Sequence, residues 1–156
     1  MVTVYLAHLF IVSRFGTGSK EVFYCGTTHA NEWITSTLLM TFFENMCMAY
    51  NRNSNIYGYN VKNILTKCTL YIVPMLNPDG VNLVNGSLNF NSNAYTYARY
   101  TARKYPDVPF PSGWKANING VDLNLQFPSG WENAKRIKYS QGYTSPSPMN
   151  YVGSAP

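Results

Sequence analysis

Residues 23–35 read Phe-Tyr-Cys-Gly-Thr-Thr-His-Ala-Asn-Glu-Trp-Ile-Thr, in which a mostly apolar strand runs into a turn and then into a helix. His29 and Glu32 stand three positions apart, and this spacing directs two side chains to the same side of a tight turn. A neutral imidazole and a carboxylate suit zinc, and catalytic zinc sites commonly combine two histidines with one glutamate. A His-x-x-Glu pair alone is more often a surface turn. Its position after a predicted strand, where open α/β sheets place their ligands, favours a metal site.

The size and composition of the chain limit its class. A length of 156 residues is that of one domain with a sizeable core. No stretch approaches the roughly 20 apolar residues of a membrane span, which predicts a soluble globular protein. The net charge of +5 reflects a shortage of acids, since the 12 lysines and arginines are scattered from Arg14 to Lys138. We therefore expect no nucleic-acid partner.

Three cysteines, Cys25, Cys47 and Cys68, occur without a Cys-x-x-Cys spacing. An odd number of cysteines without that spacing indicates neither a disulfide framework nor a thiolate zinc site. We expect buried thiols instead.

The first residues are mostly apolar, and residues 2–12 are predicted to form one or two strands. No basic residue precedes this run and no small-residue cleavage site follows it before Arg14, so a signal peptide is not indicated and a cytoplasmic protein is favoured. A true amino terminus upstream of Met1 is an alternative that the sequence leaves open. His8 is expected to be a structural residue, and residues 16–20 are expected to form a turn without the phosphate-loop pattern.

Apolar residues recur at spacings of three and four over residues 31–50, which predicts an amphipathic helix with Asn31 as its cap. A short helix at 61–65 and a strand at 69–73, ended by Pro74, are expected next.

The second half of the chain has weaker signals. Asn77-Pro78-Asp79-Gly80 is a turn signal, and alone it would be a structural turn. A helix is expected over 92–104, followed by a proline-rich loop. Residues 114–127 carry polar side chains around a short apolar strand, whereas the tail at 130–156 shows no periodicity and is expected to be irregular.

Together these stretches resemble one family, the zinc metallocarboxypeptidases. Residues 29–32 are similar to its first two metal ligands, 77–80 to its strand-end turn and 120–124 to its substrate-binding segment. Residues 121–132 resemble the bacterial branch that cleaves γ-D-glutamyl-diamino-acid bonds in peptidoglycan stem peptides. The resemblance implies an α/β fold with a mixed, mainly parallel sheet flanked by helices. It also implies that residues 1–156 form a single, partial peptidase domain.

The resemblance assigns the metal site. His29 and Glu32 would bind zinc, and Asp122 would hold the ring of the ligand histidine in a second shell. The family's third ligand, a histidine, would follow Pro156, as would its general-base glutamate and a substrate-capping tyrosine. We therefore expect the chain as given to bind zinc weakly, and a downstream segment to restore binding.

The resemblance also implies how substrate is held. Lys115 stands where the family usually has an arginine that polarises the scissile carbonyl, and a lysine provides the charge without the bidentate fork. Asn124 would hold the substrate carboxylate, but its neighbour is Leu125 where the family has an arginine. An altered specificity is expected in place of ordinary carboxypeptidase action.

Two hypotheses of function follow. The first is a zinc peptidase that hydrolyses γ-D-glutamyl amides of cell-wall peptides, weak or inactive as the chain stands. The second is a non-catalytic remnant of the fold with at most weak peptide binding. A front portion of a longer enzyme and a truncated gene product are both compatible with the sequence.

Overall fold

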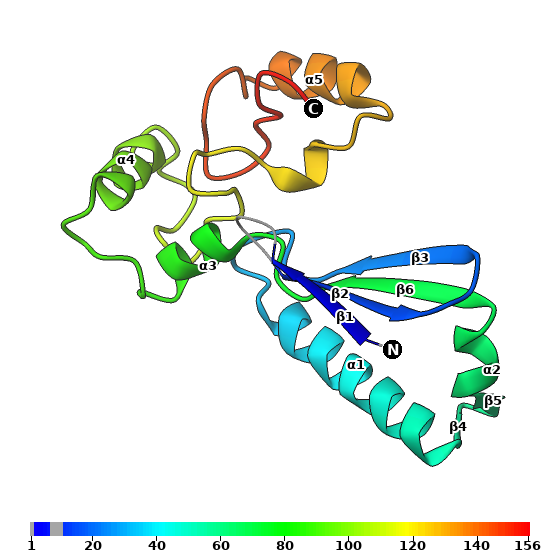
Figure 1. Ribbon diagram of the computed structural model, residues 1–156. Helices are drawn as coiled ribbons and strands as arrows, with labels where there is room; N and C mark the ends of the chain where they lie inside the picture. Colours follow the sequence, from blue (N-terminus) through cyan, green and yellow to red (C-terminus); the bar gives the residue numbers. More distant parts are fainter. Residues whose placement is uncertain (1, 7–10) are drawn as a thin grey trace. The chain divides into compact units, whose positions relative to one another are not determined.

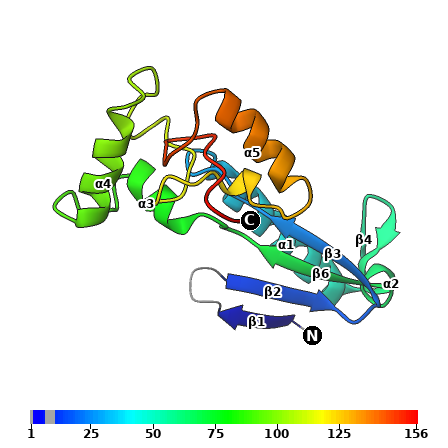
Figure 2. The same cartoon turned by 90° about the horizontal axis from the view of Figure 1, so that it is seen from above.

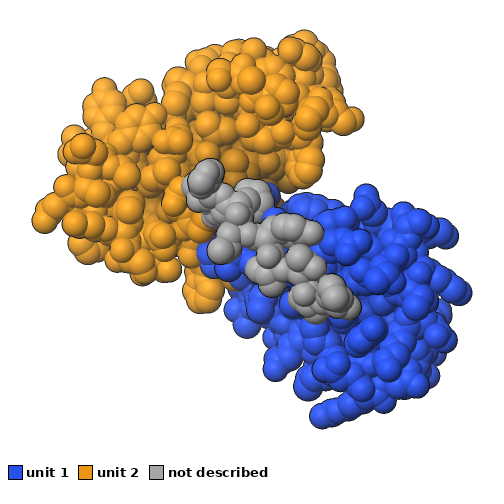
Figure 3. Space-filling model, viewed as in Figure 1, with its two compact units in different colours: residues 1–27, 34–76 blue, residues 28–33, 77–156 orange. Residues whose placement is uncertain are grey.

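The computed structural model describes residues 2–6 and 11–156 and divides into two compact units (Figure 3). The first unit comprises residues 1–27 and 34–76, and the second comprises residues 28–33 and 77–156. The prediction for His8 lies outside the described residues, and that of a single domain over 1–156 stays a prediction.

The first unit contains a mixed four-stranded sheet with the strand order β1-β2-β6-β3 (Figure 2). β1 (Val2–Leu6) pairs antiparallel with β2 (Ile11–Gly16), and β2 pairs antiparallel with β6 (Cys68–Val73). β6 pairs in parallel with β3 (Lys20–Cys25). The expected α/β class with a mixed sheet is therefore confirmed, and β3–β6 is the one parallel pairing among the described strands.

A long helix, α1 (Ile34–Arg52), covers one face of this sheet (Figure 1). It begins three residues later than predicted, because the chain is still in a turn at Asn31 and Trp33, so Asn31 is not its cap. The core beneath it includes an aromatic cluster in which the Phe15 ring lies 5.8 Å from that of Phe43. The buried members of this core are Phe15, Met46, Ala49, Val61, Leu65, Leu70 and Ile72.

The far end of the first unit holds a short hairpin, β4 (Asn55–Ile56) and β5 (Tyr59–Asn60), followed by α2 (Val61–Leu65). The Asn60 side chain caps α2 by accepting a hydrogen bond from the Asn63 N–H at 3.1 Å. The predicted helix at 61–65 and the predicted strand at 69–73 are both confirmed.

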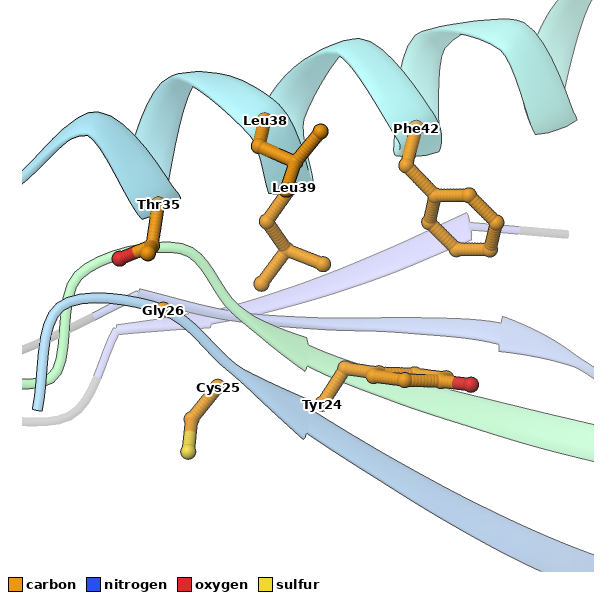
Figure 4. A pocket seen from close by; sticks show the side chains of 7 residues that line it. All are labelled: Tyr24, Cys25, Gly26, Thr35, Leu38, Leu39 and Phe42. Carbon is orange, nitrogen blue, oxygen red and sulfur yellow. The ribbon is translucent and has the colours of Figure 1, made fainter. Parts of the chain in front are cut away.

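The edge strand β3 carries apolar side chains on both faces. Phe23 is 58% exposed and Tyr24 is 48% exposed, and no strand in the described residues pairs with the outer edge of β3. Between β3 and α1 lies a hollow of about 460 Å³, where Tyr24 and Phe42 face one another (Figure 4). Strands that are apolar on both faces are typical of positions covered on both sides. The three cysteines are half-buried rather than buried, and form no disulfide.

The second unit consists of short helices joined by long loops. These helices are α3 (Pro78–Val84), α4 (Asn93–Ala102), the 3-10 turn η1 (Leu123–Leu125) and α5 (Trp131–Ser140). The expected turn at 77–80 is in fact the first turn of α3, because the Asn77 side chain accepts the Gly80 N–H at 3.1 Å and caps the helix. α4 matches the predicted helix, with Ser92 as its cap.

Two further predictions for this unit are wrong. The short strand expected within 114–127 is absent, and η1 occupies part of that segment. The tail contains α5, although no helix was expected there. Trp131 is the one buried residue of α5, and its indole N–H donates to the Val152 carbonyl at 3.1 Å. A helix anchored by a single side chain leaves little hydrophobic periodicity in the sequence.

A small core holds the second unit together. Trp114 is 1% exposed and contacts buried alanines from several segments. The buried members of this core are Ala30, Leu83, Ala98, Ala102, Trp114 and Ala116. Across both units, none of the described helices has the length and apolar character needed to cross a membrane.

Candidate metal centre

The segment that carries His29 and Glu32 belongs to the second unit and is tied to two other loops of that unit. The Ala30 N–H donates to the Lys115 carbonyl at 3.0 Å, and the Lys115 N–H donates to the Pro148 carbonyl at 2.8 Å. Ala30 is fully buried between its neighbours. These backbone bonds fix the position of the turn from which the His29 and Glu32 side chains project.

The buried Asn77 side chain links these loops by hydrogen bonds. The sequence indicated a turn at this residue but not these bonds. Its side chain is buried, and its amide nitrogen donates to the carbonyls of Thr28 at 3.3 Å, Lys115 at 3.3 Å and Ala116 at 3.0 Å. Gly80 makes room for this arrangement, because a Cβ there would lie 2.6 Å from the Asn77 side-chain oxygen and 2.7 Å from the Ala116 carbonyl. Asn77 is therefore a positioning residue for the site.

The His29 ring lies between two carboxylates. Its Nδ1 is 3.2 Å from Glu32 Oε1, and its Nε2 is 3.2 Å from Asp122 Oδ1. Asp122 is buried, whereas the Glu32 side chain is about half exposed. The predicted contact between Asp122 and the His29 ring is therefore present, although the two residues are 93 positions apart in the chain.

Asp122 is held in place by the backbone of its own turn and of the tail. Its Oδ1 accepts the Asn124 N–H at 3.1 Å, and its Oδ2 accepts the Asn150 N–H at 2.9 Å. The Asp122 N–H donates in turn to the Tyr151 carbonyl at 2.8 Å. With both oxygens engaged, the carboxylate presents a fixed acceptor to His29. Nothing in the sequence of the tail indicated that Asn150 and Tyr151 hold Asp122 in place.

Glu32 also contacts Lys115, the residue predicted to polarise the scissile carbonyl of the substrate. Lys115 Nζ lies 3.1 Å from Glu32 Oε1, the same oxygen that faces the His29 ring. Partial burial of Glu32 disfavours its charged form, but the hydrogen bonds from Lys115 and His29 and the charges of both groups outweigh this effect. The net result lowers the pKa of Glu32. The Asn124 side chain is exposed, two residues beyond Asp122.

The ring and the two carboxylates form a donor set that suits a cation. When Nε2–H donates to Asp122, the Nδ1 lone pair faces Glu32 Oε1, and two acceptors at 3.2 Å repel one another unless a proton or metal ion lies between them. One nitrogen and one carboxylate oxygen are donors that zinc accepts. Within the described residues, no cluster of three or more His, Cys, Asp or Glu side chains is placed to hold a metal. His29 and Glu32 are therefore two candidate ligands in the described part of the chain.

A sequence model of the zinc carboxypeptidases matches residues 8–155. The chain belongs to this family. The predicted resemblance is thereby confirmed, and zinc is the metal that the family implies. The match covers both compact units and all five of the predicted site residues.

Individual relatives agree with this assignment. The chain is 42% identical to Gamma-D-glutamyl-L-diamino acid endopeptidase 1 of Lysinibacillus sphaericus over 90% of its own length and 34% of the relative. It is 40% identical to the uncharacterized protein YqgT of Bacillus subtilis over 88% of its own length and 35% of that relative. Carboxypeptidase E of Caenorhabditis elegans is 31% identical over 69% of the chain. The chain thus spans about a third of the length of the first two relatives.

Proposed function

We propose that this chain is part of a zinc metallopeptidase that hydrolyses γ-D-glutamyl-diamino-acid amide bonds in cell-wall peptides. The observation that carries the proposal is the His29 ring, held between Glu32 and the buried Asp122 at 3.2 Å on each side. The substrate class rests on the similarity to a protein named as a γ-D-glutamyl-L-diamino acid endopeptidase.

In this proposal His29 and Glu32 bind the metal. Asp122 accepts the Nε2 hydrogen, which leaves Nδ1 as the ligand atom and keeps the ring in one orientation. When bound, zinc polarises the scissile carbonyl and lowers the pKa of a water molecule. The backbone bond of Ala30 and the side-chain amide bonds of Asn77 hold the loop that carries the two ligands, which favours a fixed ligand geometry.

Lys115 is the proposed group that stabilises negative charge on the scissile carbonyl oxygen. Its ammonium now pairs with Glu32 at 3.1 Å, so it must leave that carboxylate to reach a substrate. A lysine acts on an oxyanion as a single point charge, without the paired donors of arginine. The exposed Asn124 amide can donate to a substrate carboxylate, and Leu125 adds no charge beside it. We infer that Asn124 and Leu125 together select a substrate other than the free carboxyl terminus of an ordinary peptide.

A second candidate function has an observation of its own in its favour. The described residues contain no group of three His, Cys, Asp or Glu side chains that could hold a metal ion, so a non-catalytic remnant with weak peptide binding also fits. Both candidates predict zinc affinity well below that of a site with three or more protein ligands.

Zinc affinity tests the assignment of ligands. We would measure competition with a chromophoric chelator for the wild type, His29→Ala, Glu32→Gln and the matched control His8→Ala, which removes the other histidine. Weak binding that is lost in the first two variants and kept in the control supports the proposed ligands. Zinc that survives His29→Ala contradicts them, and zinc that depends on His8 reveals a ligand outside the described residues.

Hydrolysis of a γ-D-glutamyl-diaminopimelate tripeptide separates the two functions. Amine release that requires zinc and is lost in Lys115→Met supports the peptidase. If the chain binds the tripeptide but does not cleave it at saturating zinc, even when the expected downstream segment is joined to it, the remnant is the correct assignment. An α-linked tripeptide of the same composition serves as the control substrate.

A further inference from the structure

A second group of functional side chains lies on α4, apart from the residues proposed to bind zinc. Arg99 and Arg103 are four positions apart and therefore lie on the same face of this helix. They line a surface hollow of about 220 Å³. The other residues of its wall are Phe90, Tyr95, Thr96 and Tyr100.

Neither arginine forms an ion pair with an acid of the described part of the chain. No acid lines the hollow. Lys104 adds a further positive charge, because its Nζ lies 5.5 Å from the centre of the Tyr100 ring. Like charges one helical turn apart repel one another, and an anion bound between them removes that repulsion.

The remaining wall of the hollow is mostly aromatic. The Phe90 and Tyr95 rings meet edge to face at 5.1 Å, and Tyr95 contacts Phe110 at 5.7 Å. Phe110 in turn contacts the buried Trp114 ring at 6.2 Å, which anchors this row of rings in the core of the second unit. Phe90 nevertheless remains 63% exposed. An exposed ring that packs against a partly buried one offers a surface for an apolar group.

We propose that this hollow binds a carboxylate attached to an apolar or aromatic group. The guanidinium fork matches the two oxygens of a carboxylate, and arginine is favoured wherever such planar recognition is needed. The rings of Phe90, Tyr95 and Tyr100 bury the attached group, which an inorganic anion lacks. The site does not depend on the proposed peptidase function, because none of its residues contacts His29, Glu32 or Asp122 through a hydrogen bond or ion pair in the described structure.

The test is an NMR titration of the ¹⁵N-labelled chain with sodium benzoate, sodium acetate and sodium phosphate at constant ionic strength. We expect the arginine Nε–H and α4 amide signals to shift saturably, with benzoate binding at least about threefold more tightly than acetate because of ring contacts. Arg99→Gln/Arg103→Gln should weaken benzoate binding by about tenfold or more. Phe90→Ala should bring benzoate close to the affinity of acetate.

The matched control is Arg136→Gln, which removes an arginine of α5 that donates to Asn133 at 2.9 Å, outside the hollow. It should leave benzoate binding unchanged. Shifts that grow linearly with every salt, or that persist in the double variant, would overturn the proposal. Phosphate binding more tightly than benzoate would also overturn it, in favour of an inorganic oxyanion site.

Discussion

Each of the two compact units is stabilised internally by a different kind of interaction. In the first unit, side chains such as Ile72 and Leu65 are buried between α1, α2 and the sheet, and regular ladders satisfy the backbone. In the second, long loops predominate, and side chains such as Asn77 and Asp122 satisfy backbone groups that no ladder reaches. The proposed catalytic and ligand residues all belong to the second unit. A site built on loops requires such polar positioning, because loops lack a repeating hydrogen-bond partner.

The largest effect is expected from the aromatic centre of the second unit. Trp114→Ala should lower the free energy of unfolding by about 3–5 kcal/mol, because the change leaves a cavity in a small core. Trp33→Ala is the matched control, since that ring is 49% exposed, and it should cost less than about 1 kcal/mol. Urea unfolding measures both. Similar losses for the two variants would show that burial of Trp114 does not hold this unit together.

The next prediction tests whether buried polar side chains stabilise the second unit. Asn77→Ala should destabilise the chain by about 2–4 kcal/mol, because three carbonyls and the Gly80 N–H lose a buried partner. The exposed Asn119→Ala should be nearly neutral. Hydrogen exchange should show the loss of protection confined to residues 28–33 and 77–156. Uniform loss across the first unit would contradict the contrast between the units.

Asp122→Asn should weaken zinc binding by about 10–100-fold, because an amide no longer fixes the Nε2–H form of His29. The asparagine side chain retains one oxygen, which can still accept one of the two hydrogen bonds from the Asn124 and Asn150 N–H groups. The free energy of unfolding should therefore fall less than in Asn77→Ala. Chelator competition measures the affinity. Asp107→Asn, an exposed acid elsewhere in the second unit, is the control. An unchanged zinc affinity would remove Asp122 from the proposed site.

The edge of the first unit should make the chain self-associate. Phe23→Lys should raise the dimer dissociation constant by about tenfold, because it replaces an exposed apolar ring on an unpaired edge strand with a charge. Sedimentation equilibrium measures this constant. Tyr57→Lys changes a residue that is 96% exposed and lies on the β4–β5 turn, and it should have no effect. A monomeric wild type at millimolar concentration would show that this edge is already protected.

The smallest effect concerns Cys47 on α1. Burial raises the pKa of the Cys47 thiol, so the native state keeps its proton at a pH where the unfolded chain has lost it. The stabilising contribution is complete below the unfolded pKa and is lost as the pH rises through the folded one. Alkylation at pH 8.5 should therefore be slower for native Cys47 than in urea. Equal rates would show that the first unit does not shield this thiol.

The predictions from sequence succeed where the physical signal is local. A run of β-formers identified the strand at 69–73, and apolar residues at spacings of three and four identified the helix that became α1. The start of α1 was misplaced, because Asn31 is a good cap by type but the turn at 29–33 is held by bonds to a distant loop. α5 escaped prediction because one tryptophan anchors it.

The sequence alone was enough to identify the family and to name the candidate site, because each motif consists of residues that are close together in the chain. These residues are His29, Glu32, Lys115, Asp122 and Asn124. The contact between Asp122 and the His29 ring was expected from the resemblance, but only the tertiary structure gave its distance of 3.2 Å and showed that the tail holds Asp122 through Asn150. It alone placed Asn77 at the centre of three loops and brought Phe90 to the arginines of α4. The physical reason is that loop-to-loop contacts depend on buried polar partners far apart in the chain, and these leave no periodic pattern in the sequence.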